Sequence, residues 1–347
     1  MPSVSSGHID AALPGLAMGH IAINELEALQ VLLPYMVKKQ SDDIWDFDTS
    51  AAYTVAPPTG KNALEIGPGD EYEQLEYKVS SADAYRCRRY GCRVPILDRE
   101  AANWDDPALM RAFKTAKVMN TVLSEANRRG LALLGDTSTT FSSYTATPAA
   151  QWDADGSDPM DDAITATESM KSNGALVPSM HDVVLLIGED AWLRCRNNES
   201  IIGRGKYSRD MMNCTTDDWV KYLSAAGVSK VIVSRSRYNT SKDAQTPSLS
   251  LMYSDMAGFY AVPKGAGAGP ADMWPPGFGP QLGRTFIWSD PNNEGGYGQR
   301  SQEGWGFGFK RYRKDEIDAW MIQGGHDVDE VVLMAECGYV FTNLTSA

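Results

Sequence analysis

Closely spaced metal ligands are missing from this sequence. The five cysteines contain no CxxC pair, and the four histidines show neither HxxxH nor HExxH spacing. Zinc sites and redox pairs need such spacing, so the pattern favours free buried thiols and histidines with structural roles. The cysteines are Cys87, Cys92, Cys195, Cys214 and Cys337, and the histidines are His8, His20, His181 and His326. We predict no metal residue.

Long apolar runs are also missing. No uninterrupted stretch approaches the ~20 apolar residues that a membrane-spanning helix needs. The first residues, MPSVSSGHID, show neither the basic patch nor the apolar stretch of a secretory signal. The sequence therefore predicts a soluble protein that is made and kept in a cytosol, without a membrane partner.

Positive charge is scarce. The formal net charge is -13, from 32 Lys and Arg against 45 Asp and Glu. Proteins that grip nucleic acid usually carry a basic face, so specific nucleic-acid binding is disfavoured, while weak contact with bulk nucleic acid stays open. We interpret the short basic groups as salt-bridged surface. These groups are Arg86, Arg88, Arg89 and Arg93; Arg128 and Arg129; and Lys310, Arg311, Arg313 and Lys314.

Catalytic motifs are absent as well. No GxSxG elbow occurs, and GAGAGP at 265–270 lacks the GK[ST] of a phosphate-binding loop. The segment Asp153–Asp162 could supply oxygens to Ca²⁺, but its glycine stands fourth rather than sixth and Ile164 occupies the twelfth position. We interpret it as a helix start. The prediction is a protein that is not an enzyme, with no catalytic and no cofactor-binding residue and no cofactor.

What is present suffices for a substantial core. Hydrophobic residues make up 43% of the 347 residues, which predicts one large or two ordinary domains. The 31 glycines and 18 prolines indicate many turns. Nine tryptophans and 15 tyrosines favour packed or interfacial surfaces.

The first 80 residues read as an arm followed by a projection. Residues 1–19 are rich in small residues and aperiodic, so we expect an extended or disordered segment. A helix is predicted from Asn24 to Lys39, with Pro34 threatening its last turn and apolar residues at helical spacing. Those residues are Leu26, Leu29, Leu33 and Met36. Alternation from Tyr72 to Val79 indicates a strand, and the clusters at 57–60 and 67–69 indicate turns, which together fit a long two-stranded projection.

Two helices are predicted next. The first runs from Asp106 to Leu134, begins with Pro107 and is about 40 Å long at ~1.5 Å per residue. Its apolar stripe is predicted to comprise Leu109, Phe113, Ala116, Leu123 and Ala126, and Gly135 should end it. The second is expected within residues 157–174, with Ser157 or Asp158 as its cap and Gly174 after its end.

Residues 176–326 behave like a separate α/β unit. Strands are expected at 183–188, 228–236, 248–262 and 283–290, helices at 189–198 and 215–227, and a loop at 264–283. The C-terminal stretch is predicted to hold two β segments separated by Gly324–Gly325.

Four stretches in this order resemble a known family. They are EYKVSSADAYRCRRYGCRVPILDREAANWDDPALMRAF, DPMDDAITATESMKSNGALVPSMHDVVLLIGEDAWLRCRNNESI, DDWVKYLSAAGVSKVIVSRSRYNT, and LGRTFIWSDPN followed by VVLMAECGYVFTNL. They cover roughly residues 70–345. The chain resembles the major capsid proteins of tailed bacteriophages with the Hong Kong ninety-seven phage-type fold, which is an α+β fold.

The resemblance implies a role for each segment. Residues 1–45 would be the N-terminal arm and 46–80 the extended E-loop. Residues 81–175 and 327–347 would form the peripheral domain, with its spine helix at 106–134, and 176–326 the axial domain. Because no long coiled-coil segment precedes the arm, we expect any scaffolding protein to be a separate chain.

The resemblance also implies a function. The chain would assemble with itself into the hexamers and pentamers of an icosahedral head around a double-stranded DNA genome. Portal, scaffolding and possibly decoration proteins would be partners, and packaged DNA would make weak non-specific contacts. The location would be the virion, after assembly in the cytoplasm of the bacterial host.

Two other readings stay open. An encapsulin-like compartment has the same fold, and an enzyme of unknown class would share the composition. Particle size separates them, because an enzyme elutes as a small oligomer and a shell protein as capsomers or megadalton particles.

Overall fold

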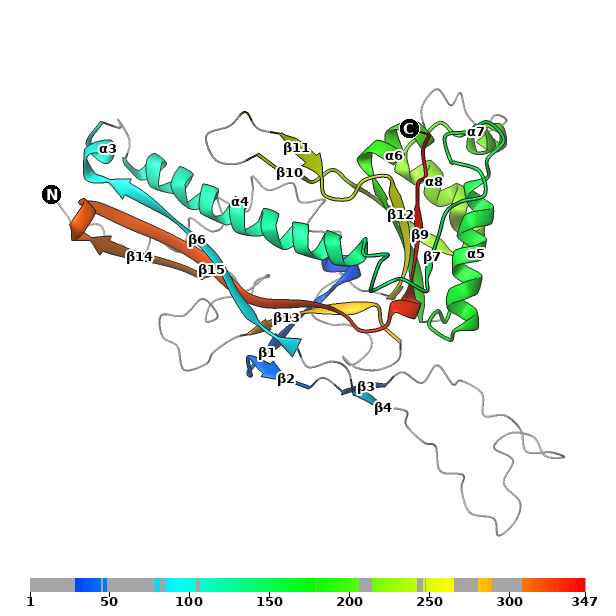
Figure 1. The fold of residues 1–347 in the computed structure, drawn as a ribbon, viewed down its shortest axis with the longest axis horizontal. Coiled ribbons are helices and arrows are strands. Elements are labelled where there is room, and N and C mark those ends of the chain that lie inside the picture. Colours follow the sequence, from blue (N-terminus) through cyan, green and yellow to red (C-terminus); the bar gives the residue numbers. More distant parts are fainter. Residues whose placement is uncertain are drawn as a thin grey trace, which may run out of the picture.

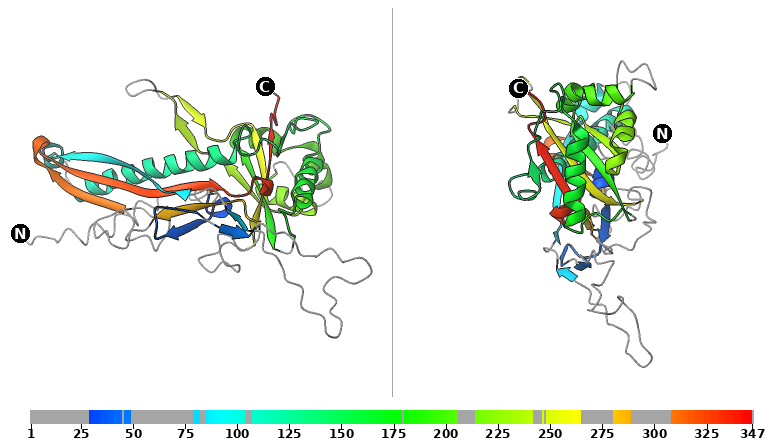
Figure 2. Two further views of the ribbon diagram at one scale, coloured as in Figure 1. Left: turned by 60° about the horizontal axis from the view of Figure 1, so that its bottom comes forward. Right: turned by 90° about the vertical axis from the view of Figure 1, so that its right-hand side faces the viewer.

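A computed structural model describes the chain in several segments. They are residues 29–44, 46–48, 79–81, 85–103, 107–178, 180–205, 214–241, 246, 248–264, 280–288 and 308–346. An elongated unit, with one long helix beside a twisted sheet, joins a compact α/β unit at one end (Figures 1 and 2). The predictions for residues 1–19, His8, His20, Asn24, Leu26, 57–60, 67–69 and 265–270, and for most of 72–79, lie outside the described residues.

One long strand organises the sheet of the elongated unit. This strand, β15, pairs antiparallel with three others, and the parallel pair of β1 and β13 extends the sheet. The strands are β1 (Tyr35–Lys38), β6 (Arg88–Leu97), β13 (Gly283–Trp288), β14 (Gly308–Lys314) and β15 (Ala319–Val332). A short helix, α3 (Asp98–Ala102), follows β6 directly.

The glycine pair in β15 does not break the strand, contrary to the prediction. Gly324 and Gly325 lie opposite Cys92 and Gly91 of β6 in an uninterrupted ladder. A Cβ atom at Gly325 would lie 2.5 Å from the carbonyl oxygen of Tyr90, and one at Gly91 would lie 2.7 Å from that of Gly324. The glycines therefore allow two backbones to approach closely instead of making a turn.

The long helix forms where it was predicted. Helix α4 (Pro107–Leu134) packs against β15 and β6 and ends before Gly135, whose N–H donates to the Leu131 carbonyl at 2.9 Å. Leu123 and Ala126 are buried as expected. Ala116 is partly buried against the core, but the prediction is wrong for Leu109 and Phe113, which are 61% and 59% exposed.

The position along the helix explains this correction. Leu131 lies five turns beyond Phe113 on the same side of the helix and is only 3% exposed, so the exposure of Phe113 depends on what packs beside its own turn. The residues of α4 that are buried come mainly from other positions of the helix. They are Met110, Val118, Met119, Val122, Leu123, Ala126 and Leu131.

The compact unit is built around a mixed sheet with the strand order β7-β16-β12-β8-β9. Helices α5 and α8 and the shorter α6 pack on this sheet. The strands are β7 (Thr145–Ala146), β8 (His181–Gly188), β9 (Val228–Ser234), β12 (Met256–Pro263) and β16 (Gly338–Thr342). The helices are α5 (Pro159–Ser172), α6 (Glu189–Cys195), α7 (Glu199–Gly205) and α8 (Thr216–Leu223).

Aromatic residues fill the centre of the compact unit. Trp152 is fully buried, and its ring centroid lies 5.9 Å from that of Trp219, 6.4 Å from Phe259 and 6.3 Å from Phe341. The indole N–H of Trp152 donates to Asp162 at 2.7 Å, so its polar atom is satisfied. Such tilted and edge-on aromatic contacts stabilise a core beyond area burial alone.

Helix caps confirm two local predictions. Asp158 caps α5 by accepting the N–H of Met160 at 3.0 Å, and Gly174 after the helix has φ of 73°. Thr215 and Asp218 form a capping box at the start of α8, and Gly227 has φ of 87°. Each of these capping residues lies next to the helix end that it stabilises, so the local sequence predicts it.

Other boundaries differ from the predictions. The helix expected over Asn24–Lys39 is helical at 29–32 but stops before Pro34, and Tyr35–Lys38 is strand β1. The strand expected at 248–262 is two strands, β11 (Leu249–Leu251) and β12, because Asp255 between them has φ of 48°.

The strand pairing also crosses the predicted domain limits. Strands β13 and β14, placed within 176–326, pair with β15 in the elongated sheet, whereas β16, placed within 327–347, pairs with β12 in the compact sheet. Strand β15 runs through residue 326 without a break. The domain limits remain predictions.

Candidate assembly surfaces

A two-stranded ribbon leaves the elongated unit on one side. Strand β2 (Asp42–Asp43) pairs with β5 (Tyr85–Arg86), and β3 (Asp46–Asp48) pairs with β4 (Val79–Ser81), both antiparallel. The ribbon points away from both sheets (Figure 1). Strand β3 and strand β4 lie at the two ends of the segment 46–80, for which a projection is predicted; the residues between Asp48 and Val79 lie outside the described part, so the projection remains a prediction.

Tyr85 anchors this ribbon. Its ring is 2% exposed and stacks on Phe286 of β13 with centroids 4.5 Å apart, while Lys38 lies 5.7 Å from both ring centroids. The N–H of Arg86 donates to Asp329 at 2.8 Å. A two-stranded ribbon is marginal in water without a packed face, so this anchor holds its base to the sheet.

Exposed apolar side chains gather at the far end of the elongated unit. Leu97 ends β6, and Ile317 lies in the 3-10 turn η2 (Asp315–Ile317) between β14 and β15; each is 43% exposed. Leu109 and Phe113 lie in the first two turns of α4, which begins near α3 at this end (Figure 1). Exposed apolar groups that gather in this way are typical of contact sites, whereas isolated ones are ordinary.

Ion pairs fix this end of the molecule. Arg313 of β14 lies 2.7 Å from Asp98 of α3 and 3.2 Å from Asp315, and the Asp98 N–H donates to the Asp318 carbonyl at 3.0 Å. The pairing with Arg313 holds the pKa of the Asp98 carboxyl below its usual value. The contacts join α3, β14 and the β14–β15 turn into one tip.

A small hairpin protrudes from the compact unit. Strands β10 (Arg237–Asn239) and β11 pair antiparallel and reach over α4 (Figures 1 and 2). Tyr238 is 37% and Leu249 60% exposed. Together with the ribbon, the hairpin gives the subunit two extensions that carry little core of their own.

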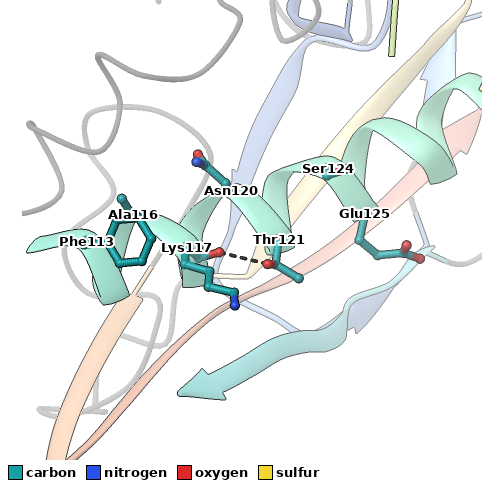
Figure 3. Close-up of a pocket in the computed structure, with 7 residues that line it drawn as sticks. All are labelled: Phe113, Ala116, Lys117, Asn120, Thr121, Ser124 and Glu125. Carbon is teal, nitrogen blue, oxygen red and sulfur yellow. Dashed lines mark hydrogen bonds between the residues drawn. The ribbon is translucent and has the colours of Figure 1, made fainter. Parts of the chain in front are cut away.

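The outward face of α4 carries a shallow groove of about 860 Å³ (Figure 3). It follows the helix from Phe113 to Glu125, with a floor of small and polar side chains. The lining residues are Phe113, Ala116, Lys117, Asn120, Thr121, Ser124 and Glu125. The Thr121 hydroxyl donates to the Lys117 carbonyl at 2.8 Å and so stays within the helix.

Several predicted surface cations are paired with carboxylates. Arg89 makes two hydrogen bonds to Asp327, at 2.8 and 3.0 Å, and Arg128 is paired with Glu125 on the exposed helix surface. Arg129 differs from the prediction, because its side chain is only 14% exposed and contacts Glu330, which is 8% exposed. In the part of the chain that the structure describes, Arg89, Arg128 and Arg129 are thus each paired with a carboxylate.

The histidines and cysteines of the described residues make contacts typical of structural side chains. His181 Nε2 lies 2.7 Å from the Pro280 carbonyl, and His326 is fully buried beside Arg129. Burial raises the pKa of Cys87 and of Cys195 to about 12, so neither is an activated thiolate. Among the described residues, no group of three or more His, Cys, Asp or Glu side chains could hold a metal ion.

The acidic segment 153–162 serves the local fold. The Asp153 carboxylate accepts the N–H and hydroxyl of Ser346, at 2.9 and 2.7 Å. Asp158 caps α5, and Asp162 accepts from Trp152. The interpretation as a helix start is confirmed. The absence of catalytic and cofactor-binding residues remains a prediction.

No helix among the described residues is long and apolar enough to cross a membrane. No protein-family model matches the sequence, and no curated protein matches it either. Similarity is found at the level of three-dimensional structure.

Three solved structures have a similar fold. A phage-related protein from Bordetella bronchiseptica superposes with a TM-score of 0.67 at 15% identity, over 96% of this chain and 97% of that one. The capsid of the cyanophage P-SCSP1u gives 0.51 at 13% identity, over 89% and 86%. An encapsulin complex from Synechococcus elongatus gives 0.51 at 10% identity, over 92% and 87%.

These similarities define the fold class. The chain has the α+β Hong Kong ninety-seven phage-type fold, which is shared by capsid shells of phage and encapsulin type. The structural similarity spans nearly the whole chain, so the shared fold includes both the elongated and the compact unit.

Proposed function

We propose that this chain is the major capsid protein of a tailed bacteriophage. It assembles with itself into hexamers and pentamers that form an icosahedral head around double-stranded DNA. The observation that supports this most is the similarity over 96% of the chain to a phage-related protein, together with the cyanophage capsid. Enzymatic activity is not part of the proposal.

The ribbon and the β10–β11 hairpin support an assembly role, because each has little core of its own. The ribbon carries Asp42, Asp43, Asp46 and Asp48 on its outgoing strands, and among the described residues only its β5 end packs on the sheet. A neighbouring subunit would cover the remainder. Contacts between different patches of identical subunits close into rings at five or six copies, and the same contacts can tile a shell.

The charge of the subunit fits a container for DNA. With a net charge of -13 and several arginines paired with carboxylates, as Arg89 is with Asp327, the wall would hold DNA weakly and without sequence preference. Portal, scaffolding and possibly decoration proteins are the further partners that we propose. The location is the virion, after assembly in the host cytoplasm.

An encapsulin-type shell is the second candidate. The encapsulin complex superposes as well as the cyanophage capsid, each with a TM-score of 0.51. The contents of the particles separate the two functions. Particles from the natural source should contain nuclease-protected double-stranded DNA; particles filled with a cargo protein instead would support the encapsulin function.

Removing the projection tests the assembly role. A chain lacking residues 57–69 keeps every described strand of the ribbon base and should fold, but it should fail to form stable shells. Circular dichroism would verify folding, and sedimentation would report assembly. Shells of normal yield and stability from the shortened chain would contradict the role proposed for residues 46–80.

A further inference from the structure

We propose that the exposed face of α4 binds the same face of a second copy of this chain, with the two helices antiparallel and a two-fold axis beside Thr121. The face follows the groove from Phe113 to Glu125 (Figure 3). The inference rests on the proposed self-assembly, because a closed shell needs contacts between its rings as well as within them. It adds which surface makes one of these contacts.

The charges on this face are self-complementary. Lys117, Thr121 and Glu125 follow one another at four-residue intervals, so they project from the same side of the helix (Figure 3). In an antiparallel pair centred on Thr121, residues equally far from Thr121 in opposite directions lie across from each other. Lys117 of each copy therefore lies opposite Glu125 of the other, and the two-fold axis makes two ion pairs from one pattern.

The same two charges are too far apart to pair within one subunit. Eight residues separate them, which is ~12 Å along the helix axis. Lys117 is exposed and makes no salt bridge with any residue that the structure describes. Glu125 is paired on the helix surface with Arg128, at 2.6 Å, and both side chains remain more than 40% exposed. The ammonium of Lys117 is thus left for a carboxylate of another molecule.

Phe113 gives the contact an apolar anchor. Its ring is 59% exposed at one end of the groove. In the antiparallel arrangement, this ring reaches the far end of the other copy's groove, beside Arg128, whose guanidinium would lie over an aromatic face. Tyr238 of the hairpin lies near Arg128 and is 37% exposed, so the ring also meets an apolar wall there.

The centre of the face allows two helices to approach. Between Phe113 and Glu125 the groove floor holds short side chains such as Ala116, Thr121 and Ser124. Packed helices lie ~8–10 Å apart, and short contact residues favour the lower part of that range. The Thr121 hydroxyl donates to the Lys117 carbonyl at 2.8 Å, so this donor at the centre is satisfied without water.

Disulfide trapping tests the geometry. Thr121→Cys places one thiol of each copy next to the two-fold axis, and Thr165→Cys on α5 is the matched control. Both threonines are exposed on a helix and donate their hydroxyl to the carbonyl four residues earlier, at 2.8 and 2.9 Å. Under mild oxidation Thr121→Cys should form covalent dimers at least ~10-fold faster than Thr165→Cys, in concentrated subunits and in shells, because a disulfide needs Cβ atoms ~4 Å apart. The native cysteines are common to both variants.

Charge reversal tests the pairing. Lys117→Glu and Glu125→Lys should each slow the crosslink of Thr121→Cys at least ~10-fold, because each alone creates two like-charged pairs across the axis. The double reversal should restore the rate. An equimolar mixture of the two single reversals should restore it as well, since every pair then joins opposite charges. Glu168→Lys and Lys171→Glu, on exposed positions of α5, control for net charge.

Two results would overturn the proposal. One is a crosslink of Thr121→Cys that is no faster than that of Thr165→Cys in subunits and in shells. The other is a pair of single reversals that mixing does not rescue, with circular dichroism showing each variant folded. Electron microscopy separates this inference from the proposed function. Normal shells without the crosslink would exclude this contact alone, whereas crosslinked dimers that never form shells would contradict the shell role and leave the contact in place.

Discussion

Arg129 offers a sharp test of how the two parts of the elongated unit are joined. From α4, its guanidinium donates to both Glu330 carboxylate oxygens of β15, at 2.8 and 3.2 Å, and lies 3.6 Å from the ring centroid of Tyr90 on β6. Arg129→Ala would leave the Glu330 carboxylate 8% exposed and without this cation. Breaking a buried pair in this way costs about 3–5 kcal/mol.

Neighbouring Arg128 provides the matched control. It pairs with Glu125 on the same helix, but both side chains are more than 40% exposed, so Arg128→Ala should cost about 0.5 kcal/mol or less. Typical folds have only ~5–15 kcal/mol of stability, so the two variants should differ visibly in soluble yield as well.

Urea unfolding of unassembled subunits, followed by tryptophan fluorescence, measures both costs. The double variant Arg129→Met, Glu330→Leu should recover much of the loss, because apolar replacement of both partners removes the buried charge. Equal midpoints for Arg128→Ala and Arg129→Ala would refute the reasoning, since they would show that the contact with Glu330 and Tyr90 contributes little.

Three further variants test other parts of the structure. Phe113→Ala should lower stability by less than ~1 kcal/mol and Met119→Ala by ~2–5, because only Met119 is buried; thermal melts giving the reverse order would mean that the helix faces are misassigned. Gly325→Ala should cost about 1–3 kcal/mol in the same melts, since its Cβ would lie 2.5 Å from the Tyr90 carbonyl oxygen, and a neutral result would exclude this close approach. Asp136 accepts the hydroxyls of Thr139 and Ser138 and the backbone N–H groups of Ser138, Thr139 and Thr140, and these hydrogen bonds hold its pKa well below its usual value. Its stabilisation is present above the unfolded pKa of ~3.9 and lost as pH falls through the lower folded value, so Asp136→Asn should cost ~1 kcal/mol in urea unfolding at pH 7 and less at pH 3; an equal cost at both would contradict the assignment.

Local sequence signals predicted much of the structure. Helix α4 and the caps Asp158 and Thr215 depend on residues within a few positions of one another, so spacing and side-chain type sufficed. Pro34 was seen as a threat to a helix, and in the structure the chain turns into strand β1 directly after it.

Non-local contacts account for the errors. The exposure of Phe113 depends on where β6 and β15 lie, and the roles of Gly325 and Arg129 depend on partners more than 190 residues away, such as Tyr90 and Glu330. Periodicity within one segment contains no information about such partners. The groove on α4 was not predicted, because Phe113 and Ala116, which line it, were expected on the buried face of the helix.

Residue patterns could not locate the assembly surfaces beyond the projection. The exposed tip combines Leu97, Ile317 and the start of α4, which come from three separate parts of the chain. Arg313 joins them through Asp98, a pairing separated by 215 residues. Only the topology of β6, β14 and β15 brings these residues to one end.

Electron microscopy of the purified chain, alone and with the proposed scaffolding protein, tests the central claim most directly. The account predicts closed icosahedral shells built from five- and six-membered rings, with the α4 helix and the ribbon base visible in each subunit of the reconstruction. A chain that stays a monomer or a small oligomer under every assembly condition would contradict it.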